Sequence, residues 1–196
     1  MSMQEYSTIV LRQIVTQMVA PDESALESFC NCFKPRKLAA SECFIEAGEQ
    51  STQFAFVNSG LLRFFYRQEN GRELNKSFAA ENHFIGAYSA YLSGSPARFT
   101  IEALEPTTLL SASLDRIVEL SDQYPCWERF RRLVTEQLYV RKEEREAEFL
   151  LDDAEHRYHL FQQRYPGLEE RIAQYHVASY IGITPVSLSR IRKRPK

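Results

Sequence analysis

Residues 177–194 read VASYIGITPVSLSRIRKR, and this stretch carries the most specific fold signal in the chain. Two helices that meet at a steep angle need a small residue where they touch. Four positions later they need a turn residue that tolerates positive φ. Ala178 and Gly182 meet these two demands. The positions that should face the shared core are apolar: Val177, Ile181, Ile183, Leu188 and Ile191. The pattern predicts two short helices joined by a tight turn at Gly182.

The second of these helices has a defined start. Thr184 is a good N-cap, and Pro185 suits the first helical position, where its missing N–H costs nothing. With its apolar side buried, the helix exposes hydroxyl and basic side chains that suit the major groove and phosphates of DNA, with Arg190 able to reach a guanine edge. The expected DNA-contacting residues are Thr184, Pro185, Val186, Ser187, Ser189, Arg190, Arg192, Lys193 and Arg194. A generic helical hairpin is the alternative.

The charge distribution supports contact with a polyanion. The chain has 196 residues and a formal net charge of −2, but residues 1–170 hold 18 Lys and Arg against 26 Asp and Glu. Residues 171–196 hold six basic residues and no acidic one. A cationic terminal module on an anionic body is expected for phosphate contact, because each neutralised phosphate releases counterions. A frayed basic tail would have the same composition.

Several classes of protein are not indicated. The N-terminus MSMQEYSTIV lacks a basic segment leading into an apolar one, and no run approaches 18 apolar residues. We therefore expect neither export nor membrane contact, and a cytoplasmic location. Four cysteines at 30, 32, 43 and 126 suit neither a disulfide framework nor usual iron–sulfur spacings, which favours ordinary buried thiols. Metal-ligand, nucleophile–base and phosphate-loop patterns are also missing from the sequence, so an enzyme is not expected.

The body of the chain changes its hydrophobic period twice. Residues 5–33 read as helical, with a break at Pro21-Asp22. From about Lys37, short aromatic and β-branched runs alternate with Gly and Asn turns, and Asn70-Gly71 between two runs is typical of a type I′ hairpin turn. The first 115 residues or so are therefore expected to form an antiparallel β-domain with helices at its edges.

A long helix is expected to follow Pro125 and to run to about Leu151. Within it, residues three and four apart form a heptad seam: Phe130, Leu133, Gln137, Val140, Glu144, Ala147 and Leu151. The seam predicts a two-fold dimer interface, although the helix could instead pack only on its own β-domain. The charged run RKEEREAE at residues 141–148 is expected to be a solvated face with i, i+4 charge pairs. A second helix, AEHRYHLFQQRYPGL, ends at Pro166-Gly167.

Three stretches make the chain resemble the Crp/Fnr family of transcriptional regulators: FAFVNSGLLRFFYRQENGREL, FIGAYSAYLSGSPARFTIEALEPT and VASYIGITPVSLSRIRK. The resemblance implies an α+β fold with a jelly-roll-like antiparallel β-roll in residues 1–121 and a dimerisation helix in 122–152. It implies an all-α helix-turn-helix DNA-binding domain of winged-helix type in 153–196. It also implies a homodimer that binds double-stranded DNA, with RNA polymerase as a candidate partner. A protein partner in place of DNA, contacted by a nucleotide-sensing module, is the alternative reading.

Two departures from the family pattern matter. Members that bind cyclic AMP carry a Gly-Glu pair and, about ten residues on, an arginine. Here Ala87 follows Gly86, and Ala97 stands at the arginine position. Because alanine can neither accept from a ribose hydroxyl nor pair with a phosphate, cyclic AMP is not expected to bind in the usual way. An unidentified small molecule remains the expected effector, if there is one, near Phe84, Ile85, Gly86, Ala87, Tyr88, Arg98, Phe99 and Thr100.

The second departure lies in the reading helix. Members with the best-known operator place Arg, Glu and Arg three, four and eight residues after the turn glycine. This chain has Pro185, Val186 and Arg190 at those positions. We therefore expect a different target sequence, with Val186 placed to touch a thymine methyl group.

Overall fold

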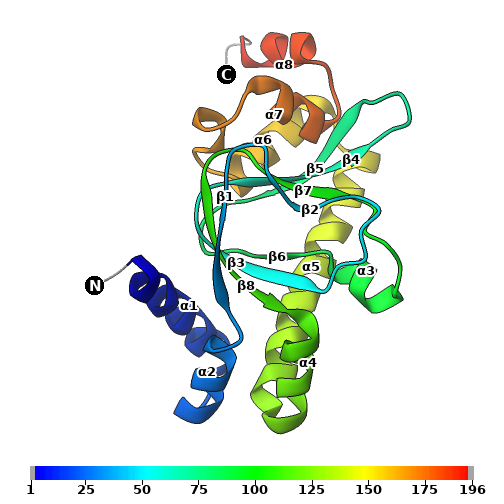
Figure 1. Cartoon of the computed structure of the whole chain (residues 1–196). Coiled ribbons are helices and arrows are strands. Elements are labelled where there is room, and N and C mark those ends of the chain that lie inside the picture. Colours follow the sequence, from blue (N-terminus) through cyan, green and yellow to red (C-terminus); the bar gives the residue numbers. More distant parts are fainter. Residues whose placement is uncertain (1–2, 194–196) are drawn as a thin grey trace.

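A computed structural model describes residues 3–193 of the chain, with side chains from residue 8 onward (Figure 1). The helices are α1 (Met3–Val19), α2 (Glu23–Cys30), α3 (Tyr88–Ser93), α4 (Leu114–Gln123), α5 (Pro125–Leu151), α6 (Ala154–Arg164), α7 (Gln174–Ile181) and α8 (Pro185–Arg192), with a short 3-10 turn, η1 (Leu168–Glu170). The strands are β1 (Lys34–Leu38), β2 (Cys43–Ile45), β3 (Gln53–Ser59), β4 (Leu62–Arg67), β5 (Glu73–Ala79), β6 (Phe84–Gly86), β7 (Thr100–Ala103) and β8 (Thr107–Ser113).

The strands form two antiparallel four-stranded sheets, in the orders β1-β8-β3-β6 and β2-β7-β4-β5. Side chains alternate between the faces of a strand, so each sheet buries one row of residues against the other. Phe44, Val57, Phe64, Ile101 and Leu109 are among the buried residues of the core between the sheets. The antiparallel β-domain with flanking helices predicted from the sequence is confirmed.

The predicted type I′ turn between β4 and β5 is wrong. Among the described residues other than glycine, only Ala20, Ser41 and Asn82 have positive φ, so Asn70 does not adopt the conformation that a type I′ turn needs. Instead the Gly71 N–H donates to the Gln68 carbonyl, and Gly71 alone has positive φ, at 81°. The connection is a longer loop in which one glycine takes the left-handed position.

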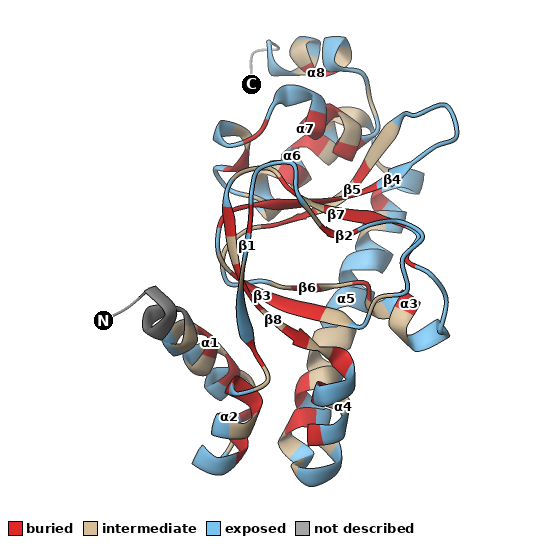
Figure 2. Ribbon diagram, viewed as in Figure 1, coloured by how far each residue is buried: buried red, intermediate tan, exposed pale blue. Residues whose placement is uncertain are grey.

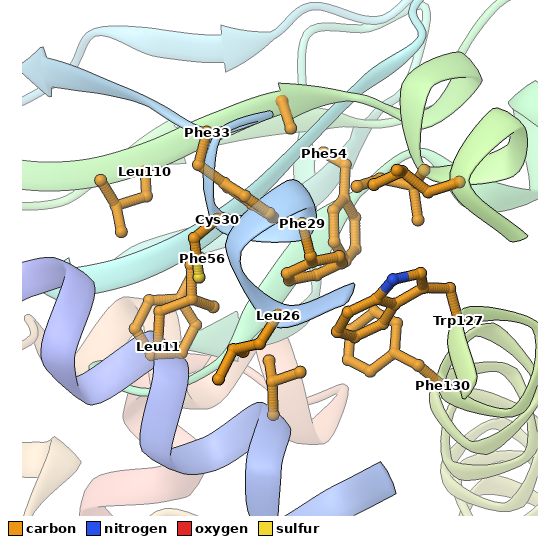
Figure 3. Close-up of a cluster of buried hydrophobic side chains, with 14 of the residues drawn as sticks. Leu11, Leu26, Phe29, Cys30, Phe33, Phe54, Phe56, Leu110, Trp127 and Phe130 are labelled. Carbon is orange, nitrogen blue, oxygen red and sulfur yellow. The ribbon is translucent and has the colours of Figure 1, made fainter. Parts of the chain in front are cut away.

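The N-terminal helices cover the outer face of the first sheet. Pro21 ends the first helical run, and the Asp22 side chain caps α2 by accepting from the Ala25 N–H at 2.8 Å. Helices α1 and α2 pack on β3, β8 and the start of α5 through an apolar cluster (Figure 3). At its centre the Phe29 ring stacks on Trp127 at 4.2 Å and meets Phe130 edge-on at 5.3 Å.

The long helix α5 begins and ends as expected, but it is preceded by α4, a ten-residue helix not predicted from the sequence. Phe130, the first residue of the predicted dimer seam, is 1% exposed and belongs to the chain's own core. It therefore offers no accessible surface to a partner. The heptad pattern included Phe130 because a core contact and an interface contact share the same spacing.

The C-terminal helices pack on the far side of the second sheet. A third buried cluster joins Leu61 and Phe78 of the β-domain to Phe161, Tyr180 and Leu188. Figure 2 shows this buried zone between β5 and α7, with α8 beyond it at the end of the molecule. The part of the chain from 153 to 193 contains helices and no strand, which agrees with the expected all-α domain and places no β-ribbon of a wing in these residues.

Two substitutions on α5 should differ sharply in their effect on stability. Phe130→Ala removes a fully buried ring and should lower the free energy of unfolding by about 3–5 kcal/mol, measured by urea denaturation. Val140→Ala, in the same predicted seam but 53% exposed in the single chain, should cost less than about 1 kcal/mol when unfolding is measured on the monomer. Equal losses for the two variants would contradict the placement of Phe130 in the core.

Candidate nucleic-acid interface

Gly182 shapes the connection between α7 and α8. It has φ 77°, and the N–H groups of Gly182 and Ile183 close the end of α7 on the carbonyls of Ser179 and Ala178. A Cβ at this position would lie 2.6 Å from Cε1 of Phe149 on α5. The turn therefore needs glycine both for its backbone conformation and for the close approach of α5. The predicted turn at Gly182 is confirmed.

The start and the buried side of α8 also follow the sequence rules. The Thr184 hydroxyl accepts from the Ser187 N–H at 3.2 Å, and Pro185 is the first helical residue. Leu188 is fully buried, whereas Ile183 and Ile191 are partly buried against the same cluster. These contacts fix which side of α8 faces the protein.

The opposite side of α8 faces solvent. Thr184, Pro185, Val186, Arg190, Arg192 and Lys193 are exposed, Ser187 and Ser189 are intermediate, and Arg194 lies outside the described residues. Among the described side chains, residues 8–193, no carboxylate forms an ion pair with Arg190, Arg192 or Lys193. The outer face of α8 is therefore basic and has its cations available to an anionic partner.

A buried polar contact holds α7 on β5. The Asn75 side-chain amide lies 3.1 Å from Nδ1 of His176 and donates to the His176 carbonyl at 3.0 Å. The Asn75 N–H donates to the Ser179 hydroxyl, which donates to the Glu73 carbonyl. Burial and the nearby Arg63 guanidinium lower the pKa of His176 to about 4. A neutral ring suits this contact, because an unprotonated Nδ1 can accept from the Asn75 amide.

Two arginines outside α7 bind the carbonyls at its C-terminal end. Arg145 of α5 donates to the Tyr180 carbonyl and stacks on the Tyr180 ring at 3.8 Å. Arg157 of α6 donates to the Ile181 carbonyl at 2.9 Å. Cations are favourable here because the last carbonyls of a helix carry partial negative charge. The long helix α5 thus contacts the segment that carries α8.

The Arg145 contact corrects the prediction that RKEEREAE is a wholly solvated face. Glu148 is 5% exposed and accepts from both Arg145 and Arg164, which lower the pKa of its carboxyl group. The residue pattern does not indicate this inward side, because Arg and Glu at these spacings are typical of solvent-facing helix pairs. Asn75 and His176 were missed as well, since they lie 101 residues apart.

A further ion-pair group holds the segment before α7. Arg171 donates to the carboxylates of Glu81 and Glu105, on two different loops of the β-domain. The pKa of Glu81 falls to about 2 because Arg171 and backbone N–H groups donate to its carboxylate. Arg171 is one of the six basic residues in the last 26 positions, so it serves an internal contact and not the outer basic face.

The predicted effector residues do not share one surface: Ile85, Ala87 and Phe99 lie in the core between the sheets, whereas Phe84 and Tyr88 pack against the outer cluster around Phe29 and Phe130. Ile85, Ala87, Phe99 and Thr100 are buried, Phe84, Gly86 and Tyr88 are intermediate, and Arg98 is exposed. The Thr100 hydroxyl accepts from the Ala47 N–H at 3.2 Å. Ala87 and Ala97 are 1% and 2% exposed and pack in the core between the sheets. This part of the roll thus presents apolar methyl groups where the family's nucleotide-binding members have charged ones.

The middle of α5 presents the predicted dimer seam. Leu133 is partly buried in the chain's own core, while the remaining seam residues are exposed: Gln137, Val140, Glu144, Ala147 and Leu151. Neighbouring apolar side chains are exposed as well, with Tyr139 at 63%, Leu150 at 76% and Leu151 at 82%. An apolar face of this kind is unusual on a lone helix in water.

No group of three or more His, Cys, Asp or Glu side chains in residues 3–193 is placed to hold a metal ion. In the same part of the chain, no helix is both long enough and apolar enough to cross a membrane.

Comparisons with known proteins agree with this architecture. Residues 35–124 match the family model of the cyclic nucleotide-binding domain. No curated protein is similar enough in sequence to match the chain. Among solved structures, the c-di-GMP-responsive global regulator CLP of Xanthomonas campestris is similar with a TM-score of 0.70 and 16% identity, covering 88% of this chain and 90% of that one.

Two further solved structures are also similar over most of the chain. FixK2 of Bradyrhizobium japonicum has a TM-score of 0.72 and 16% identity, with 82% of each chain covered. The catabolite activator protein of Thermus thermophilus has a TM-score of 0.56 and 21% identity, covering 91% of this chain and 84% of that one. The chain therefore shares the fold of these solved regulators, and residues 35–124 resemble a cyclic nucleotide-binding domain.

Replacing the turn glycine tests the local geometry. Gly182→Ala places a methyl group at positive φ and against the Phe149 ring, which stacks on Arg145. Gly71→Ala is a matched control, since Gly71 has a similar φ of 81° but open space around it. Both variants should lose about 1–2 kcal/mol for the backbone conformation, and Gly182→Ala should lose roughly 1 kcal/mol more for the displaced ring. Urea unfolding measures both, and identical losses would disprove the close approach of α5.

The buried histidine predicts a pH dependence. The pKa of His176 is about 4 in the folded chain and 6.5 without the protein environment, so the unfolded state binds the proton more readily. This contribution to stability is complete above about pH 6.5 and falls as the pH drops toward 4. Between pH 7 and 5 the loss should be on the order of 2 kcal/mol.

The control for this prediction is His176→Gln, which keeps a polar side chain and does not titrate. Urea unfolding of both proteins at pH 7 and pH 5 gives the comparison, and the variant should show the smaller loss. The same loss in both proteins would show that His176 is not the responsible group.

Proposed function

We propose that this chain is a sequence-specific, DNA-binding transcription regulator that acts as a homodimer, with α7 and α8 forming a helix-turn-helix. The observation that supports this proposal most directly is the outer face of α8. It is basic, has no carboxylate partner among the described residues, and is held outward by the buried side of α7. A face of this kind attracts DNA phosphates and displaces their counterions.

Base contacts follow from the exposed side chains of α8. Arg190 can donate two hydrogen bonds to the O6/N7 edge of guanine, and Val186, which is 63% exposed, can contact a thymine methyl group. The Thr184 and Ser187 hydroxyls lie at the N-terminus of α8, where phosphate is favoured. Arg192 and Lys193 then contribute backbone contacts at the other end.

Dimerisation follows from the exposed seam of α5. A two-fold axis along two α5 helices would bury Val140, Ala147 and Leu151 against their copies and present both α8 helices on one side. Such dimers read half-sites about one helical turn apart. Any contact with RNA polymerase stays a prediction.

The buried Ala87 and Ala97 support a regulator that does not bind cyclic AMP in the usual way. The alternative is a sensor that acts on a protein partner without DNA, and it draws support from the cyclic nucleotide-binding domain match alone. Duplex binding distinguishes the two functions.

The test is selection of binding sites from random duplexes, followed by affinity measurements at several salt concentrations. Arg190→Ala should weaken binding to the selected site by about 1–3 kcal/mol and relax the preference at one base pair. Arg116→Ala is the matched control, because Arg116 is exposed on α4 at the opposite end of the molecule from α8 (Figure 1). Failure to bind any duplex at low salt would overturn the proposal, as would equal effects of the two variants.

A further inference from the structure

Arg171 joins the helical C-terminal part of the chain to one end of the β-roll. It lies between η1 and α7, next to Ile172, which is buried in the cluster shared by the roll and α7. The Arg171 guanidinium donates to both carboxylate oxygens of Glu81, each at 3.0 Å. It also donates to both carboxylate oxygens of Glu105, at 2.5 Å and 3.4 Å. One side chain is therefore bound by two carboxylates of the roll.

The two carboxylates are fixed in place by the fold of the roll. Glu81 lies in the loop between β5 and β6, and Glu105 lies in the loop between β7 and β8. The Gly60 N–H, in the turn between β3 and β4, donates to the Glu81 carboxylate at 2.9 Å. The Leu104 N–H donates to the Leu61 carbonyl at 2.8 Å, which joins the same turn to the loop of Glu105. Three connected loops thus form the acceptor for the guanidinium.

The middle of α7 has a second directional contact with the roll, at a β-bulge in β5. Asn75 and Ser77 lie opposite consecutive residues of β4, so Lys76 has no cross-strand partner and is the extra residue. A bulge redirects the side chains beside it, and Asn75 bonds to His176 of α7. Apolar burial is not directional, so the cluster around α7 does not by itself fix an angle. The polar contacts before α7 and in its middle together fix the angle at which it crosses the roll.

The ion pairs of Arg171 matter for direction more than for stability. The side chains of Arg171, Glu81 and Glu105 are 33%, 38% and 33% exposed, so solvent screening leaves these pairs a small share of the folding free energy. A bidentate arginine–carboxylate pair nevertheless fixes geometry, because its two N–H···O bonds define both a position and a plane. Removing the guanidinium should therefore loosen the direction of α7 and α8 without unfolding the chain.

We propose that Arg171 is a positioning residue for DNA binding, which sets the direction of α8 and thereby the spacing of the half-sites that a dimer reads. This inference rests on the proposed function. In a dimer, the separation of the two reading helices depends on the angle that each makes with its own roll. Arg171 acts on that angle through Glu81 and Glu105, and its charge is occupied by these partners and not by phosphate.

The test compares DNA affinity at three half-site spacings: the spacing found by selection, and versions with one base pair added or removed. Arg171→Gln should reduce the preference for the selected spacing roughly threefold, because reorienting α8 no longer breaks the ion pairs. Arg190→Ala removes a base contact and should weaken binding by the same factor at every spacing. Arg116→Gln breaks an ion pair within α4 and is the matched control, with the preference unchanged.

A second variant tests whether Arg171 acts through its carboxylate partners. Glu105→Gln should lower the spacing preference in the same direction as Arg171→Gln. Adding it to Arg171→Gln should cause no further reduction, because the two substitutions remove the same contact. An unchanged preference in Arg171→Gln, or fully additive effects of the two substitutions, would overturn the positioning role.

A measurement without DNA separates this inference from the proposed function. Residual dipolar couplings of backbone amides in residues 35–124 and 154–192 of the full chain report whether the two parts share one orientation. In Arg171→Gln the couplings of residues 154–192 should be scaled down, because these residues then sample a range of directions, whereas Arg116→Gln should leave them unchanged. Unscaled couplings in Arg171→Gln would contradict the orienting contact.

The two experiments together distinguish the ways in which the inference can fail. Scaled couplings in a chain that binds no duplex would support the orienting contact and reject the regulator function. Duplex binding with an unaltered spacing preference in Arg171→Gln would reject the positioning role and leave the regulator function in place.

Discussion

The packing of α7 against β5 is the contact on which the rest of the C-terminal structure depends. Helix α7 has eight residues, far fewer than an isolated helix needs to persist in water. Its stability must therefore come from tertiary contacts, which are the apolar cluster around Phe78 and Tyr180 and the buried Asn75–His176 pair. Because α8 is joined to α7 by a single tight turn, the packing of α7 on β5 also sets the direction in which α8 faces.

The long helix α5 connects the separate parts of the molecule. Its N-terminal turns belong to the aromatic cluster with Phe29, its middle is exposed, and its last turns bind the C-terminal end of α7 through Arg145. A rotation or shift of α5 relative to the roll would therefore act on α7 directly. Coupling between distant sites can be carried by a rigid element that contacts both, and α5 contacts both the aromatic cluster beside the roll and the end of α7.

The sequence predicted the features that follow from local rules and missed those that depend on distant partners. Gly182, Thr184 and Pro185 were predictable because turn and cap chemistry involves only near neighbours. Phe130 was assigned to a dimer seam because periodicity identifies an apolar face but not what covers it. The bulge at Lys76 leaves no mark in the residue pattern, since Lys on a strand ordinarily faces solvent. The buried side of Arg145 and Glu148 was hidden for the same reason.

The interior of the roll contains both apolar cassette residues and one lysine amine. Ala87 and Ala97 remove ionisable groups from the cassette, and their burial leaves no polar atom in need of a partner. A roll built this way can stay packed without a ligand. Lys76 lies against Phe99 of the same core. Desolvation of its unpaired ammonium costs free energy, and only loss of the proton or pairing with an anion relieves that cost. Lys76 also lies on the strand that contacts α7, one residue from Asn75 and three from Glu73, whose backbone groups bond to Ser179 of that helix.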